Sequence, residues 1–198
     1  MRTRLAVLCA AILLAGCAAP QNRGGDLNVP RDLSLGGKTY QLAFKDANPR
    51  QSIWEFTTDG EKVEEWQWTR LATINLMRLG EVPIERWTAV MQRELDNTRP
   101  LPRYAFQQQG NTVLANIVYP PSAKRPVYES NAWLVRTVPG CGGIVNLQFA
   151  RQVKPTAGMT EAAEVERLQR QNAVSYTHLA DRQARLRLNG PRPIATKS

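Results

Sequence analysis

The feature that most constrains the fold of this chain is the alternation of apolar and polar side chains at a period of two. In residues 38–44, apolar side chains that include Tyr40 occur at every second position. In residues 52–58, apolar side chains stand on either side of Glu55. This spacing predicts strands with one buried face. Asp59 and Gly60 follow the second run and form a typical turn pair. The chain therefore opens its folded part with antiparallel strands.

Residues 65–77 continue the alternation, with Trp66 and Trp68 first in the run. A helix is the main rival interpretation. Tryptophan, threonine and isoleucine favour strands, so we expect one long, bent strand here. Trp66 and Trp68 would then share one side of it. We expect Trp68 to lie in the core. The sequence does not decide whether Trp66 lies in the core or on the surface.

Helical spacing follows Pro83, where Ile84, Trp87, Met91 and Leu95 recur every three to four residues. A proline fits the first helical turn because no backbone N–H is needed there. The period then returns to two, which predicts four further strands at residues 103–108, 112–119, 128–138 and 143–153. Residues 160–172 predict a second helix, with Thr160 as its cap.

The order of these elements predicts the fold class. Short hairpin connections between strands favour an antiparallel sheet. We expect an α+β domain over residues 37–173, with a sheet of six to seven strands. The long helix and the C-terminal helix are expected to pack on one face of it.

The first twenty residues predict where in the cell the protein is located. Two arginines precede an uncharged run at residues 5–15, which is the layout of a secretory signal and is shorter than the roughly 20 residues of a membrane span. Leu14-Ala15-Gly16-Cys17 resembles the lipobox of bacterial lipoproteins. The resemblance implies that residues 1–16 are removed and that Cys17 carries the lipid. The alternative is an ordinary signal with a chance cysteine.

Ala18 follows that cysteine. In lipoproteins of this type an aspartate at this position usually retains the protein in the inner membrane. The resemblance therefore implies sorting to the outer membrane, with the domain facing the periplasm. Residues 17–36 are expected to be the lipidated end and a flexible tether, because they are rich in polar residues and glycine.

The charge balance argues against a nucleic-acid partner. The net charge is +9, but residues 17–173 hold 19 Lys and Arg against 16 Asp and Glu. The body also lacks a basic run with interleaved aromatics. Cysteine and histidine clusters are missing from the sequence, so we expect no metal and no cofactor.

Cys141 and the C-terminal residues leave alternatives open. With Cys9 in the signal and Cys17 lipidated, Cys141 has no intrachain partner. Three interpretations of Cys141 remain open: a catalytic residue, a partner in an intermolecular disulfide, and an unreactive thiol. Residues 174–198 are expected to be disordered. Val174–Leu179 also resembles the conceptual translation of a transposon end used in sequencing libraries, which implies a non-native tail; a natural basic tail is the alternative.

The remaining chemistry lies around the first turn. Its acidic residues are Glu55, Glu61, Glu64 and Glu65, and paired carboxyls can cleave glycosidic bonds, but acids on a solvated hairpin are commoner. The tryptophans mostly suit a core, and a ligand groove is the alternative. We expect a candidate binding face at Trp54, Glu55, Glu61 and Trp66, with no catalytic residue.

Residues 54–66 resemble a pattern found in small uncharacterised secreted or lipid-anchored bacterial proteins. This resemblance implies no activity. We therefore expect a non-catalytic envelope protein that binds a protein partner or a ligand. A periplasmic small-molecule carrier is the first alternative and would need an apolar cavity of roughly 300 Å³ or more. A cell-wall glycan hydrolase using Glu55 or Glu61 is the second.

Overall fold

The computed structural model describes residues 27–138 and 142–185, and the side chains only as far as residue 173. The predicted signal peptide, Cys17 and Cys141 lie outside the described residues. No helix among the described residues is long and apolar enough to cross a membrane.

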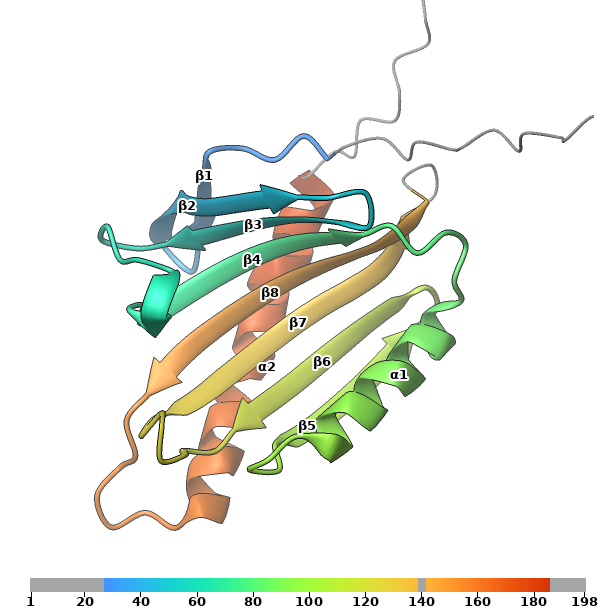
Figure 1. Ribbon diagram of the computed structural model, residues 1–198. Coiled ribbons are helices and arrows are strands. Elements are labelled where there is room, and N and C mark those ends of the chain that lie inside the picture. The colour runs from blue at the N-terminus through green and yellow to red at the C-terminus, as the bar shows by residue number, and fades with distance from the viewer. Residues whose placement is uncertain (1–26, 139–141, 186–198) are drawn as a thin grey trace, which may run out of the picture.

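The described residues form one eight-stranded antiparallel sheet with two α-helices and one short 3₁₀ helix, which confirms the α+β class (Figure 1). The strand order is β1-β2-β3-β4-β8-β7-β6-β5. The strands are β1 (Asp32–Leu35), β2 (Lys38–Ala47), β3 (Gln51–Thr57), β4 (Arg70–Met77), β5 (Arg103–Gln109), β6 (Thr112–Tyr119), β7 (Tyr128–Val138) and β8 (Gly143–Val153). The helices are α1 (Ile84–Asn97), α2 (Glu161–Arg185) and the short 3₁₀ helix η1 (Glu64–Trp66).

The sheet has eight strands rather than the expected six to seven. The missed strand is β1, which lies inside the predicted tether and before the predicted domain start at residue 37. Gly36 and Gly37 both have positive φ and turn the chain so that Leu33 pairs with Tyr40. Leu33 is buried in the core. Four residues are too few for a period-two pattern to stand out.

The two helices lie on opposite faces of the sheet, not on one face as expected. Trp87 and Leu95 of α1 belong to clusters with Val113 and Ala115 of β6. Val165 and Leu168 of α2 pack instead on Val118 and Tyr128. Side chains alternate between the two faces of a strand, so odd- and even-numbered residues of β6 meet different helices. Figure 1 shows α1 in front of the sheet and α2 behind it.

Helix α2 is longer than the predicted residues 160–172. We expected disorder from residue 174, and instead the helix continues to Arg185. Residues 173–185 contain no glycine or proline, so nothing in their backbone chemistry ends a helix there. Residues 186–198 lie outside the described part of the chain.

The largest core cluster lies on the α2 side of the sheet. It includes Tyr40, Phe56 and Leu76, which are nearly inaccessible to solvent. Tyr40 and Phe149 meet edge to face with 6.0 Å between ring centroids, a geometry that aromatic quadrupoles favour. The apolar core therefore lies on the α2 side of the sheet. The opposite side carries more polar residues.

Candidate functional site

The sheet face that carries α1 is only partly covered by that helix. α1 packs over β5, β6 and β7, while the same face of β3, β4 and β8 bears polar side chains. We call this set the polar face. Most of its residues are direct cross-strand partners, which places them on one side of the sheet. Glu55 pairs with Thr73, Thr73 with Gln148, and Asn75 with Asn146. Asn131 of the neighbouring strand β7 lies on the same side.

Two buried oxygens of the polar face have no hydrogen-bond partner among the described residues. They are the Oδ1 atoms of Asn75 and Asn146, and Trp133 Nε1 on the same face is also without one. Asn146 is 6% exposed. A buried polar atom left unpaired costs about 1–3 kcal/mol. Such atoms are rare in folded proteins, so these two acceptors and one donor are an unusual feature of the polar face.

The loop between β3 and β4 is held by the carboxylate of Glu61. Its two oxygens accept hydrogen bonds from the backbone N and the Oγ1 of Thr69, at 3.0 and 2.6 Å. Thr57 Oγ1 donates to the carbonyl of Glu61 at 2.7 Å. Glu61 is therefore used to close the loop that carries η1.

The backbone of η1 has an unusual conformation. Glu65 and Trp66 have φ of 57° and 61°, which bulky residues rarely adopt. We expected a continuous strand from residue 65, and this left-handed turn is the reason that β4 starts only at Arg70. Gln152 Nε2 donates to the carbonyl of Trp66 at 3.1 Å. Backbone strain of this kind costs about 1–3 kcal/mol and gathers at functional sites.

Trp66 and Trp68 stack on one another, with 5.6 Å between centroids and 28° between planes. Trp68 is 5% exposed and packs on Leu71 and Ala150, as expected for a core residue. Trp66 is 40% exposed. The guanidinium of Arg125 lies over the Trp66 ring, with Cζ 3.5 Å from its centroid. We call Trp66, Trp68 and Arg125 the aromatic stack.

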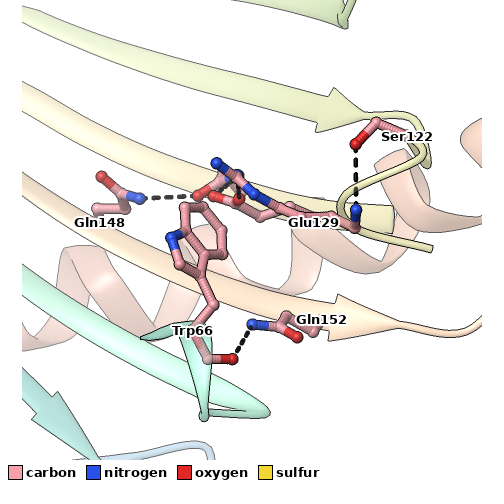
Figure 2. Close-up of polar contacts among 7 residues, drawn as sticks. Trp66, Ser122, Glu129, Gln148 and Gln152 are labelled. Atoms are coloured by element: carbon pink, nitrogen blue, oxygen red, sulfur yellow. Dashed lines mark hydrogen bonds and ion pairs between the residues drawn. The ribbon is translucent and has the colours of Figure 1, made fainter. Parts of the chain in front are cut away.

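A chain of polar contacts joins the aromatic stack to the polar face (Figure 2). Arg125 Nη1 lies 3.8 Å from Glu129 Oε2. Asn131 Nδ2 donates to Glu129 Oε1 at 3.1 Å, and Gln148 Nε2 donates to Asn131 Oδ1 at 2.8 Å. Ser122 orients the Arg125 loop, since the Arg125 backbone N donates to Ser122 Oγ at 3.2 Å. Segments far apart in the sequence thus form one continuous surface.

Burial shifts the pKa values of the acidic groups on this surface. It raises the pKa of Glu129, although the bond from Asn131 and the charge of Arg125 oppose the shift. It raises the pKa of Tyr119 to about 12, with the Glu129 charge adding to the effect. The pKa of Glu55 is raised by burial and then by the charge of Glu64. Each of these groups is more easily kept neutral than in water.

The four predicted binding-face residues do not lie together. Trp54 is 5% exposed and belongs to the core on the α2 side, because it alternates with Glu55, which lies on the polar face. Glu61 holds its loop, and Trp66 is exposed in the aromatic stack. Arg125 and the amide residues were not predicted from the sequence. Asn146, Gln148 and Gln152, which share one side of β8, were the available signal for the amide residues.

The two carboxyls whose pKa is raised by burial, Glu55 and Glu129, lie too far apart to work as a glycosidase pair. Glu55 on β3 and Glu129 on β7 are separated by β4 and β8. Three strand spacings correspond to about 14 Å, beyond the roughly 5–9.5 Å of paired glycosidase carboxyls. Within residues 27–138 and 142–173, no group of three or more His, Cys, Asp or Glu could hold a metal.

Two surface cavities of the described residues have volumes of ≈ 470 and ≈ 390 Å³. The first is lined by Arg103, Glu161 and Glu166 among others, and the second by Lys45 and Arg78 among others. Both have charged walls. Neither is the enclosed apolar cavity that a carrier of apolar molecules requires.

The fold and this surface define an α+β domain with one antiparallel sheet and a partly uncovered polar face. The chain belongs to an uncharacterised protein family, whose model matches residues 27–183. No curated protein sequence matches the chain. Among solved structures, the chain is similar to a mutant of the protein Mog1, at 13% identity and a TM-score of 0.47, covering 81% of this chain and 96% of that one.

Proposed function

We propose that this protein is a lipid-anchored protein of the bacterial outer membrane that faces the periplasm and works by binding a protein partner, without catalysis. The observation that carries the proposal is Trp66. This tryptophan is 40% exposed on a strained backbone, and a core-packing role does not explain that arrangement. Exposed aromatic and arginine side chains are the residues that most often dominate binding energy at protein interfaces.

The polar face supports the same proposal. The Oδ1 atoms of Asn75 and Asn146 are acceptors and Trp133 Nε1 is a donor, and none of the three has a partner among the described residues. A partner segment that supplies backbone N–H and C=O groups would satisfy these atoms. Their desolvation cost is already present in the free protein, so pairing them on binding is favourable.

The anchor rests on Leu14-Ala15-Gly16-Cys17, which precedes the described residues. Two or three acyl chains hold a protein at a membrane durably, whereas one holds it only marginally. Binding at the membrane surface then needs no helix that spans the bilayer.

A photocrosslinking amino acid at position 66 tests the proposal in native envelopes. We expect one specific crosslinked partner, which is lost when Arg125→Ala and Asn146→Ala are added. A crosslinker at exposed Val90 on α1 serves as the matched control and should yield no such product. Equal products from positions 66 and 90 would contradict the assigned surface.

A hydrolase is the second candidate, because the raised pKa of Glu55 suits a general acid. Turnover of peptidoglycan fragments by the wild type that is lost in Glu55→Gln would favour it. Persistence of partner crosslinking in the same variant would separate the two functions.

A further inference from the structure

Three arginines gather on the opposite face of the sheet, beside α2. Arg70 of β4 and Arg151 of β8 are direct cross-strand partners. Both point to the α2 side, because they alternate with Leu71 and Ala150, which lie under the aromatic stack. Directly opposed residues of an antiparallel pair have Cα atoms about 4.5–5.5 Å apart, so two positively charged side chains start side by side on neighbouring strands. Like charges so placed destabilise a sheet.

Arg167 of α2 adds a third positive charge. The pKa of Arg151 is lowered by burial first and then by the charges of Arg70 and Arg167, so both of these guanidinium groups lie close enough to act on that of Arg151. Arg70 and Arg151 also lower the pKa of Tyr40 against the larger raising effect of its burial. The Tyr40 hydroxyl therefore belongs to the same cluster.

The carboxylates near this cluster are already engaged. Glu164 is hydrogen-bonded to Arg167, and Glu61 accepts both bonds from Thr69. Among the described residues, neither Arg70 nor Arg151 forms an ion pair with a carboxylate. The positive charge exceeds the negative charge at this place.

Donors in the cluster also lack acceptors. The Nε atoms of Arg151 and Arg167 are buried without a hydrogen-bond partner. The Arg151 side chain is held in place by Asn172, whose Oδ1 accepts from Nη2 at 3.3 Å. Arg70, Arg151 and Arg167 are each partly exposed, Arg167 to 30%, so the cluster is in contact with solvent. Preorganised guanidinium donors with no acceptor are the chemistry that recognises oxyanions.

We propose that Arg70, Arg151 and Arg167 form a binding site for an oxyanion group, a phosphate or a carboxylate, on the α2 side of the sheet. The bound anion accepts hydrogen bonds from the free guanidinium N–H groups and removes the repulsion between the two cross-strand arginines. The site is separate from the Trp66 surface and does not depend on partner binding there.

Thermal melts and calorimetric titrations of the full-length protein test this site, with inorganic phosphate and acetate as probes at constant ionic strength. We expect a saturable rise of Tm with at least one probe, as for any ligand that binds only the folded state. Arg151→Gln and Arg70→Gln should each weaken binding by roughly tenfold or more, because each removes a charge-assisted hydrogen bond. Their melting temperatures without anion should not fall, since repulsion is relieved.

Arg136→Gln is the matched control, because Arg136 is a half-buried arginine on the same face of β7. It should bind the probes as the wild type does. Binding of phosphate alone indicates a phosphate ligand, and binding of acetate alone or of both probes indicates a carboxylate-tolerant site. Absence of saturable binding to either probe, or equal weakening in Arg136→Gln, would overturn the proposal. If Arg151→Gln fails to fold, the titration of Arg70→Gln decides the question.

Discussion

The guanidinium carbon of Arg125 lies 3.5 Å from the centroid of the Trp66 ring. The stacking face of an exposed aromatic residue is thus occupied by the protein's own cation. Arg125 comes from the connection between β6 and β7, and Trp66 comes from η1 between β3 and β4. This contact bridges two loops that the chain order keeps 59 residues apart.

The first prediction measures this contact with a double-mutant cycle of Trp66→Ala and Arg125→Ala. A cation over a partly exposed indole is worth about 0.5–2 kcal/mol, so we expect a coupling near 1 kcal/mol in urea unfolding followed by circular dichroism. The cycle isolates the pair because single effects on the loops cancel. A coupling indistinguishable from zero would mean that the contact between Arg125 and Trp66 contributes nothing to stability.

The second prediction separates the two stacked tryptophans. Trp68→Ala should lower the free energy of unfolding by about 3–5 kcal/mol, because it empties a buried site. Trp66→Ala should cost less than about 1 kcal/mol, because its side chain is largely outside the core. Trp66→Gly should be at least as stable as Trp66→Ala, since glycine accepts a φ of 61° without strain. An unshifted midpoint for Trp68→Ala would contradict its core role.

The hairpins and α1 could be predicted because their signals are local. The alternation in residues 112–119 and the spacing from Ile84 to Leu95 report directly on which side chains are buried. β6 also holds a partial signal for the opposed helices, because Val113 and Ile117 lie on one side and Leu114 and Val118 on the other. Apolar residues on both sides require cover on both faces.

The candidate site could not be predicted in the same way. Trp66 fits a strand by residue type, and only its positive φ removes it from the pattern. Arg125 reaches Trp66 across β7 and β8, a proximity set by strand order and not by spacing along the chain. The pairing of Arg70 with Arg151 likewise follows from register, which a sequence without its fold does not give.

The third prediction concerns pH and Glu129. Burial raises the pKa of this carboxyl in the folded state, so the folded protein holds the proton more tightly than the unfolded chain. Stability should therefore fall as the pH rises from the ordinary carboxyl value of 4.5 through the folded pKa. Glu129→Gln should flatten this dependence and be more stable at neutral pH. Urea unfolding across the pH range checks both, with exposed Glu166→Gln as control.

The opposite slope would contradict this sign. A wild type that gained stability with rising pH above the carboxyl value, and lost that gain in Glu129→Gln, would mean that the Arg125 pair outweighs burial. The contact of 3.8 Å to a half-exposed arginine makes the pair the weaker effect, because exposed ion pairs contribute about 0–1 kcal/mol.

The fourth prediction concerns the anchor. Cys17→Ser should give a protein without palmitate label that is released from membranes, because the thiol that carries the lipid is gone. Fractionation after a high-salt wash measures this. Cys141→Ser is the matched control and should remain membrane-bound. Outer-membrane partitioning of Cys17→Ser after the wash would mean that lipid is not the anchor.

The fifth prediction concerns Asn172, which fastens α2 to the sheet. This side chain is fully buried. Its Oδ1 accepts from Ser130 Oγ at 2.9 Å, and its Nδ2 donates to Asn116 Oδ1 and the carbonyl of Asn131 at 2.8 and 2.9 Å. Asn172→Ala leaves these buried groups unpaired and opens a small cavity. We expect a loss of about 3 kcal/mol in the free energy of unfolding.

The control for Asn172 is Arg170→Ala, two residues earlier on the same helix. Arg170 is 65% exposed and, within the described part of the chain, pairs with exposed Glu166, so its removal should cost about 0.5 kcal/mol or less. Hydrogen exchange gives a second measurement, because α2 should exchange faster in Asn172→Ala while β3 and β4 keep their protection. Equal losses in the two variants would mean that apolar packing of Val165 and Leu168 holds α2, and that the buried amide network adds nothing to its attachment.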